Sequence, residues 1–274
     1  MTLNELIRAA IKEDMPTGDV TSESLALKPR LGRARLKAKE DIVLSGALAF
    51  EETMHAIEPN CKVKWHFEEG DVILSGQIIC TLEGDLIQIL KAERVALNFL
   101  GHLSGIATHT RRFVKETEGT KTKILDTRKT TPAFRDLEKR AVVHGGGVNH
   151  RMNLSTAILI KDNHISVMGG LKNAVQRVRD HSELPIEVEA RTLEEVKEAV
   201  EVKAQRILLD NMNNETLKSA LAMIPADMET EASGNMSVDR IRSVAELGVD
   251  YISVGALTHS APCADVSLVF QWED

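Results

Sequence analysis

The sequence predicts an α/β fold, namely an incomplete, open α/β barrel of about six βα units together with an N-terminal α+β sandwich domain. Six short apolar segments recur after residue 120, and stretches with helical apolar spacing lie between them. Because neighbouring parallel strands need a crossover connection, usually a helix, this alternation indicates a parallel sheet. A closed barrel of this kind has about eight units, so six favour an open barrel, with a doubly wound sheet as the alternative. The segments are residues 123–129, 157–163, 185–190, 206–211, 228–234 and 251–256.

The first part of the chain has a different pattern. Thr2 and Glu5 match a capping box in front of a helix with an apolar stripe. Between residues 33 and 89, short apolar runs alternate with glycines and acidic turns, which indicates β-rich structure. Helical spacing follows from 87 to 103, and we expect this helix to link two domains and to end near Gly101 to Gly105. The expected domains are residues 1–110, joined by 265–274, and residues 111–264.

The composition excludes several classes of protein. The chain has 274 residues, of which 43% are hydrophobic and 27% charged, as is typical of an ordered, soluble globular protein. Its three cysteines form no C-x-x-C pair, which disfavours a zinc knuckle or a disulfide framework and makes a reducing cytoplasm the expected setting. No apolar run reaches the roughly 18 residues of a membrane span, and the first residues do not resemble a signal peptide. A net charge of −7 and few aromatic residues argue against nucleic-acid binding, so we expect a small-molecule protein.

Positive charge is concentrated in one segment of this acidic protein. From Lys121 to Lys161 there are nine basic residues and three acidic ones. The segment contains the glycine-rich stretch HGGGVNHR (144–151), and Lys161 directly follows the apolar run AILI. A basic cluster is often only a solvated surface. Here the charges lie in predicted loops and at predicted strand ends, so we expect them to bind an anion.

Charged side chains follow successive predicted strands at their carboxyl ends. In a barrel these ends meet at one rim, where active sites are found. Lysine and arginine on one side of a rim, with carboxylates on the other, suit a polyanion that also carries a divalent cation. The residues expected to converge are Arg128, Lys129, Lys161, Glu189, Asp210 and Glu231.

A phosphate cradle is expected at the last two strands. Ser233, Gly234 and Asn235 separate a predicted strand from the helix that begins with SVDRI. The free N–H groups and the dipole at the start of such a helix attract anions. Gly255 and Ala256 follow the next strand and complete the expected cradle.

Longer motifs, in order along nearly the whole chain, resemble the quinolinate phosphoribosyltransferases. Several motifs in order are far more specific than any single one. The usual phosphoribosyltransferase signature, two acids followed by a G-T-rich phosphate loop, is absent, and this family is known for lacking it. The matching stretches are EDMPTGDVTSE (13–23), LNFLGHLSGIAT (97–108), DTRKTTPAFRDLEKRAV (126–142), GGGVNHR (145–151), ILIKDNH (158–164), IEVEA (186–190), LLDNM (208–212), EASGN (231–235) and DYISVGALTHS (250–260).

The resemblance implies that quinolinate condenses with phosphoribosyl pyrophosphate to give nicotinate mononucleotide, pyrophosphate and carbon dioxide in de novo NAD biosynthesis. It implies Mg²⁺ as cofactor, held by Glu189 and Asp210 directly or through water. It also implies a homodimer with shared active sites, open to higher assembly, in which Arg94 reaches the partner's barrel. By resemblance, quinolinate is bound by Arg94, Thr127, Arg128, Lys129, His150 and Arg151. The phosphoribosyl group is bound by Lys161, Glu189, Asp210, Ser233, Gly234, Asn235, Gly255 and Ala256, and the catalytic residues are Lys129, Lys161, Glu189 and Asp210.

The chain departs from the family pattern at two positions. Ala133 stands where the family commonly has glycine, and Arg140 stands where tyrosine is common. Both positions bear on local loop geometry, and neither is an expected substrate ligand.

Three other functions stay open at this point. A paralogous pyrophosphorylase associated with molybdenum transport shares much of the motif set and acts on another base. A barrel aldolase would use Lys161 as a Schiff-base nucleophile, which requires an apolar pocket around the lysine. A binding module without catalysis would need only the phosphate cradle.

Overall fold

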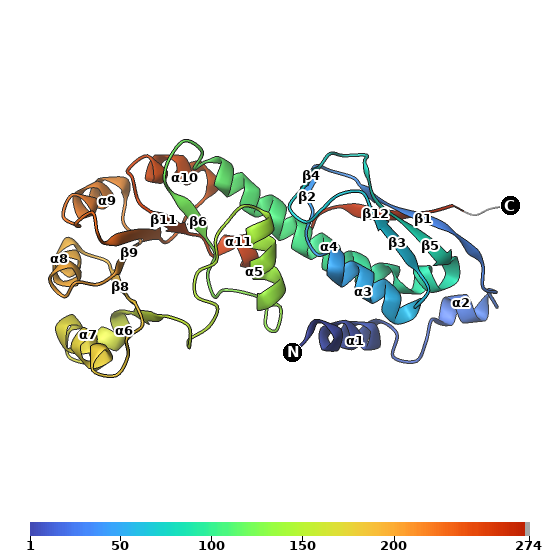
Figure 1. Ribbon diagram of the computed structural model, residues 1–274, viewed down its shortest axis with the longest axis horizontal. Coiled ribbons are helices and arrows are strands. Elements are labelled where there is room, and N and C mark those ends of the chain that lie inside the picture. The colour runs from blue at the N-terminus through green and yellow to red at the C-terminus, as the bar shows by residue number, and fades with distance from the viewer. Residues whose placement is uncertain (272–274) are drawn as a thin grey trace. The chain divides into compact units, whose positions relative to one another are not determined.

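The computed structural model describes residues 1–271, and the chain divides into two compact units (Figure 1). Unit 1 consists of Met1–Arg111, Thr131–Gly146 and the chain from Ser260 on, and unit 2 consists of Arg112–Thr130 and Gly147–His259. The segment Thr131–Gly146 therefore belongs to unit 1, whereas the sequence-based division placed it with the barrel. No helix within the described residues is long and apolar enough to cross a membrane.

Unit 1 is an α+β unit built on a four-stranded antiparallel sheet. Its elements, apart from one long helix, are α1 (Leu3–Asp14), α2 (Val20–Ser24), β1 (Leu31–Ala38), β2 (Ile42–Val43), α3 (Ala47–Ile57), β3 (Lys62–Trp65), β4 (Val72–Ile73), β5 (Ile78–Asp85), α5 (Arg135–His144) and β12 (Val266–Gln271). The sheet has the order β12-β1-β5-β3, and the predicted Thr2–Glu5 capping box is confirmed. Because β12 pairs with β1, Val266–Gln271 of the segment expected to join this domain lies in this sheet. Residues 272–274 lie outside the described residues.

The long helix α4 (Leu86–Lys115) passes from unit 1 into unit 2, and its predicted end near Gly101 to Gly105 is wrong. Both glycines lie inside the helix, and their lack of a side chain leaves space for the segment that contains Pro262 and Ala264. A Cβ atom on Gly105 would lie 2.0 Å from the Pro262 carbonyl oxygen, and the N–H of Ala264 donates to the Gly101 carbonyl at 2.8 Å. Glycine costs a helix about 1 kcal/mol, and here it provides space for a neighbouring backbone.

Unit 2 contains the predicted parallel sheet, an open barrel of six strands. Its elements are β6 (Lys123–Leu125), β7 (Ile158–Ile160), α6 (Asp162–Val167), α7 (Leu171–Arg179), β8 (Ile186–Ala190), α8 (Leu193–Glu201), β9 (Arg206–Asp210), α9 (Asn214–Leu221), β10 (Glu229–Ser233), α10 (Val238–Ala245), β11 (Tyr251–Ser253) and α11 (Ala256–His259). The strand order is β6-β11-β10-β9-β8-β7, and no described residues pair β6 with β7, so the sheet is not closed. Strands β7 to β11 follow one another without a reversal of order, which excludes the doubly wound alternative.

The strands of unit 2 carry acidic side chains on one face. Along β8, Ile186, Val188 and Ala190 alternate with Glu187 and Glu189, so the two carboxylates share a face. Figure 1 shows α7, α8, α9 and α10 along the other side of the curved sheet. The alternation therefore packs the apolar residues against these helices and directs the carboxylates to the inner side.

Candidate active site

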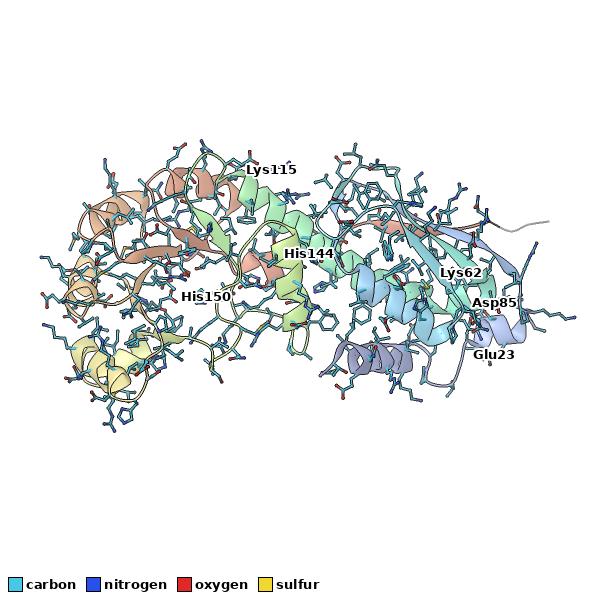
Figure 2. The ribbon with its side chains drawn as sticks, in the orientation of Figure 1. Glu23, Lys62, Asp85, Lys115, His144 and His150 are labelled. Atoms are coloured by element: carbon cyan, nitrogen blue, oxygen red, sulfur yellow. The ribbon has the colours of Figure 1, made fainter. Side chains whose placement is uncertain are left out.

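A cavity of about 370 Å³ lies at the carboxyl ends of the strands of unit 2. His150, labelled in Figure 2, marks its place on the side of the sheet away from α7 to α10. A second cavity, of about 560 Å³, shares four predicted residues with the first: Thr127, Lys129, Asp210 and Ser233. The first also has Arg128, His150, Arg151, Lys161, Glu189 and Glu231 in its lining, and the second has Gly234, Asn235, Gly255 and Ala256. One continuous group of residues thus includes all predicted site residues except Arg94.

Glu189 is the centre of an ion-pair network on one wall. Lys161 Nζ lies 2.8 Å from Glu189 Oε2, and the Arg191 guanidinium lies 3.1 Å from Oε1 of the same carboxylate. Arg191 also reaches Asp162 at 2.8 Å and Asp210 at 3.3 Å. Since Glu189 is only 6% exposed, its negative charge needs such partners to be stable. The network holds Glu189 of β8 and Asp210 of β9 next to the positive charges of Lys161 and Arg191.

His150 is held at both ring nitrogens. Its Nε2 lies 3.1 Å from a Glu187 oxygen and 3.5 Å from a Glu231 oxygen, and its Nδ1 accepts a hydrogen bond from the Arg151 N–H at 2.7 Å. Burial on its own would lower the pKa of His150, but the hydrogen bonds and charges of the two carboxylates outweigh it and raise that pKa to about 9. The hydrogen bond from the Arg151 N–H favours the neutral ring, in which Nδ1 has no proton, whereas the two carboxylates favour the doubly protonated ring. Nε2 carries a proton in both forms.

Two arginines place positive charge on the same cavity. Burial, and next the charge of Arg128, lower the pKa of Arg151, and Glu187 opposes this effect. Mutual repulsion between two guanidinium groups is relieved when an anion binds between them. Because each guanidinium can donate two parallel hydrogen bonds to a carboxylate, the pair suits a ligand with two carboxylates.

The residues of the expected phosphate cradle line one cavity at the ends of β10 and β11. Gly234 has φ +95°, and a Cβ atom there would lie 2.2 Å from Asn211 Oδ1, so only glycine fits. Ser237 occupies the N-cap of α10, but its side chain makes no capping hydrogen bond, which leaves first-turn N–H groups for an anion. A Cβ atom on Gly255 would come within 3.0 Å of the Lys129 side chain. Glycine at this position therefore lets Lys129 lie against the cradle.

Sequence reasoning missed three residues of the site, namely Arg191, Asn211 and Glu187. Arg191 follows Glu189 by two positions, and Asn211 directly follows Asp210, so their places just beyond strand ends were the available signal. Asn211 has φ +55° and its amide donates to Asp210 at 2.8 Å. Glu187 is 7% exposed and lies within a short strand, where acids are uncommon, and this pattern in IEVEA was a further signal.

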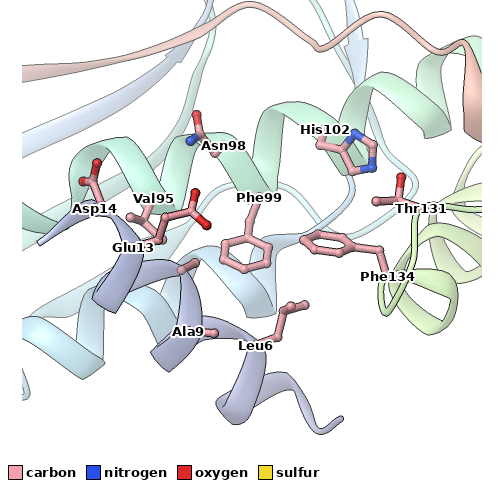
Figure 3. A pocket seen from close by; sticks show the side chains of 11 residues that line it. Leu6, Ala9, Glu13, Asp14, Val95, Asn98, Phe99, His102, Thr131 and Phe134 are labelled. Carbon is pink, nitrogen blue, oxygen red and sulfur yellow. The ribbon is translucent and has the colours of Figure 1, made fainter. Parts of the chain in front are cut away.

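Unit 1 has a cavity of its own, of about 410 Å³, between α1, α4 and the start of α5 (Figure 3). Phe99 and Phe134 stack in its wall with ring centroids 5.7 Å apart. Within the described chain, its lining has no lysine or arginine, so it lacks the charges that an anionic substrate requires. Arg94, the remaining predicted ligand, also belongs to unit 1, where it is exposed on α4.

Comparison with known proteins agrees with the motifs. Residues 19–104 match the N-terminal domain of quinolinate phosphoribosyl transferase, and residues 106–269 match its C-terminal domain. The chain belongs to the quinolinate phosphoribosyltransferase family. It is 38% identical over 270 residues to a probable nicotinate-nucleotide pyrophosphorylase (carboxylating) of Bacillus subtilis, with 98% of this chain and 93% of that one covered. A chloroplastic nicotinate-nucleotide pyrophosphorylase (carboxylating) of Arabidopsis thaliana is 39% identical, with 99% and 83% covered.

Solved structures of this family share the fold. The nicotinate-nucleotide pyrophosphorylase of Francisella tularensis superposes with a TM-score of 0.95 at 37% identity, with 98% of this chain and 96% of that one covered. The corresponding protein of Ehrlichia chaffeensis gives a TM-score of 0.95 at 37% identity, with 99% of each chain covered. Both similarities extend through the two units.

The backbone bears on one expected departure from the family pattern. Ala133, which the resemblance sets against a glycine, has φ +68°. That conformation is costly for a residue with a Cβ atom and free for glycine. The substitution therefore strains the turn before α5 and leaves the cavity residues of unit 2 unchanged.

Proposed function

We propose that this chain transfers the phosphoribosyl group of phosphoribosyl pyrophosphate to quinolinate, and that the reaction takes place in the cavity of unit 2. The enzyme is then a nicotinate-nucleotide pyrophosphorylase (carboxylating) that makes nicotinate mononucleotide, pyrophosphate and carbon dioxide for NAD synthesis. The observation that supports this most is the joint lining of one cavity by three arginines, two lysines and the carboxylates Glu189 and Asp210. The family membership supplies the substrates.

Quinolinate is a planar dianion, and the arginine side of the cavity matches it. Arg128 and Arg151 bind its carboxylates, with Thr127, Lys129 and His150 beside them. Fixing both carboxylates orients the ring nitrogen, which is the nucleophile. The repulsion between the two guanidinium groups disfavours the empty site and favours a doubly charged ligand over nicotinate.

Phosphoribosyl pyrophosphate binds across the two cavities. Its 5-phosphate lies in the cradle of Ser233, Gly234, Asn235, Gly255 and Ala256, where N–H groups of the α10 terminus donate to it. The ribose hydroxyls donate to Glu189 and Asp210. Lys129 and Lys161 face the pyrophosphate and neutralise charge that develops as it leaves.

Asp210 and Glu189 suit magnesium to different degrees. Mg²⁺ prefers carboxylate oxygens and retains water, and the Asp210 carboxylate opens into both cavities. Both oxygens of Glu189 already accept from Lys161 and Arg191, so Glu189 would act through water. Bound there, the ion would neutralise charge on the pyrophosphate.

The bonds change in two stages. The lone pair of the quinolinate nitrogen forms a bond to C1 of the ribose as the C1–oxygen bond breaks, and pyrophosphate leaves with that electron pair. Glu189 and Asp210 stabilise the positive charge that grows on C1. The ring nitrogen is then cationic, so the C2–carboxylate bond breaks, carbon dioxide leaves, and C2 keeps the electron pair and takes up a proton.

We also propose a homodimer in the reducing cytoplasm. Arg94 would then be contributed to the partner's quinolinate site from its exposed position on α4. Higher assembly of dimers is compatible with this arrangement.

The alternatives fit the site less well. Schiff-base lysines lie in apolar pockets, whereas Lys161 donates to a buried carboxylate. A binding module without catalysis would need the cradle but would have no use for Lys161 and the carboxylates Glu189 and Asp210. The paralogous pyrophosphorylase differs only in its base, and a site built for two carboxylates favours quinolinate.

The test measures the formation of nicotinate mononucleotide from quinolinate and phosphoribosyl pyrophosphate in the presence of Mg²⁺, by the wild type and by Arg151→Ala. Nicotinate mononucleotide from the wild type, together with its loss in a folded Arg151→Ala variant, would place the reaction in this cavity. Arg177→Ala, an exposed position on α7, is the matched control and should retain wild-type turnover. Unchanged quinolinate turnover in Arg151→Ala would contradict the assignment of the site.

A further inference from the structure

Two buried carboxylates lie below the arginine side of the cavity and have no part in the bond changes. Glu187 on β8 is 7% exposed, and Glu231 on β10 is fully buried. In each of them one oxygen, Oε1, is buried without a hydrogen-bond partner. Anionic groups at the base of a site for anions are unfavourable unless they serve another purpose, because they repel the ligand and are costly to bury.

Both carboxylates converge on a single atom, His150 Nε2, at 3.1 and 3.5 Å. The other ring nitrogen accepts from the Arg151 N–H, and the His150 N–H donates to Asp126 at 2.8 Å. His150 and Arg151 lie outside any helix or strand, so no ladder of backbone hydrogen bonds fixes them. Their placement depends on this group of side chains.

His150, Glu187 and Glu231 together have the composition of a metal site, and their ligand atoms lie within 4.8 Å of one another. The hydrogen bond from the Arg151 N–H argues against a metal ion at this place. A neutral imidazole that accepts at Nδ1 carries its proton on Nε2, and an imidazolium also has a proton there. Neither form has a lone pair on Nε2 for a cation. The carboxylates therefore bind the histidine.

We propose that Glu187 and Glu231 are positioning residues, which act through His150 to fix the loop that carries Arg151 against the quinolinate carboxylates. The buried charges hold the Nε2–H of His150 and thereby fix the residue next to Arg151 in the chain, and the Arg151 guanidinium is further held by the Ala157 carbonyl at 3.1 Å. The cost of burying two carboxylates is offset by a preorganised anion site. This assignment rests on the proposed function.

The experiment compares Glu187→Gln and Glu231→Gln with the control Glu201→Gln. Glu201 is exposed and pairs with Lys172 at 2.8 Å, so its substitution removes one negative charge without touching His150, Glu187 or Glu231. We expect KM for quinolinate to rise by about tenfold or more in the first two variants, because a buried charge-assisted hydrogen bond is lost. KM for phosphoribosyl pyrophosphate should change by less than about twofold, since the cradle is built by other residues. The control should retain both wild-type values.

The outcomes distinguish a failure of the positioning role of Glu187 and Glu231 from a failure of the proposed function. An active wild type with unchanged quinolinate KM in folded Glu187→Gln would overturn the positioning role alone. A parallel rise of both KM values, with an equal fall in the thermal unfolding midpoint, would show general damage and would also overturn it. If Glu231→Gln does not fold, Glu187→Gln decides the question. A folded wild type without turnover would overturn the proposed function, and this assignment with it.

Discussion

Lys161 Nζ lies 2.8 Å from Glu189 Oε2, so a cation from the end of β7 and a buried carboxylate from β8 form one wall of the cavity. In the proposed reaction, the pair would put positive charge beside the leaving pyrophosphate and negative charge beside the ribose. The pair also argues against a Schiff-base role for Lys161, because such a lysine lies in an apolar pocket.

Replacing Lys161 by methionine should lower kcat by about 10²- to 10³-fold, because a charge that stabilises the leaving group is removed. Lys161→Arg should retain part of the activity. Lys172→Met, at an exposed pair with Glu201, is the control for loss of one positive charge. Steady-state kinetics will decide this, and full turnover in Lys161→Met, or borohydride trapping of a carbonyl substrate on Lys161, would contradict the account.

Arg191 pairs with Glu189 at 3.1 Å and with Asp210 at 3.3 Å, so we expect it to compete with Mg²⁺ for these two carboxylates. Arg191→Gln should therefore bind Mg²⁺ more tightly by several-fold, on the order of 1 kcal/mol, while kcat falls because the carboxylates lose their fixed positions. Calorimetric titration with magnesium chloride alone measures the first effect. Lys172→Gln changes the net charge equally at a distant exposed pair, so an equal gain in its magnesium affinity would refute a local cause.

Gly234 and Gly248 provide a matched pair of substitutions. Both have positive φ, +95° and +88°, but a Cβ atom on Gly234 meets Asn211 at 2.2 Å, whereas one on Gly248 meets nothing within 4 Å. Each alanine should cost about 1 kcal/mol of backbone strain. Only Gly234→Ala should also raise KM for phosphoribosyl pyrophosphate, by about tenfold or more, because the cradle must shift. An equal KM for phosphoribosyl pyrophosphate in the two variants would contradict the assignment of the cradle as the site of its 5-phosphate.

The pKa of His150 predicts a pH dependence of stability. It is raised from 6.5 to about 9 in the folded chain, so the folded state holds the proton more tightly than the unfolded state. Its contribution to the free energy of unfolding is complete below pH 6.5 and is lost as the pH rises toward 9. Urea unfolding at pH 6, 7.5 and 9 should show this fall in the wild type and a smaller one in His150→Gln. Parallel curves would mean that His150 has an ordinary pKa.

Ala133→Gly should stabilise the protein by roughly 0.5–1 kcal/mol, because it relieves the φ of +68° at the cost of a more flexible unfolded chain. Urea unfolding measures this, and the quinolinate kinetics should stay as in the wild type. Ala26→Gly, also at positive φ (+50°), tests whether the gain is general to such positions. A loss of stability in Ala133→Gly would show that the alanine methyl group has packing that outweighs the strain.

The sequence was sufficient to predict the parallel sheet and the convergence of Lys161, Glu189 and Asp210. Apolar runs that end in a charge reveal strand ends, and the geometry of parallel strands brings those ends together. Glu187 and Arg191 were missed because their partners, His150 and Asp162, come from other parts of the chain. Local patterns do not identify pairs that only the fold creates.

The glycines of α4 show a similar limit. Gly101 and Gly105 have the sequence signal of a helix end, but contacts with Pro262 and Ala264, more than 150 residues away, account for them. The assignment of Thr131–Gly146 to unit 1 likewise depends on tertiary contacts, such as the 2.8 Å bond between Glu138 and His102. Propensity describes the chain near each residue, and tertiary packing overrides it here.

The most direct measurement is the rate of product formation from phosphoribosyl pyrophosphate and Mg²⁺ with quinolinate labelled in its 2-carboxylate, compared with nicotinate. The account predicts labelled carbon dioxide, pyrophosphate and nicotinate mononucleotide in equal amounts from quinolinate and no mononucleotide from nicotinate. Folded protein that forms no product from quinolinate, or that uses nicotinate equally well, would contradict the central claim.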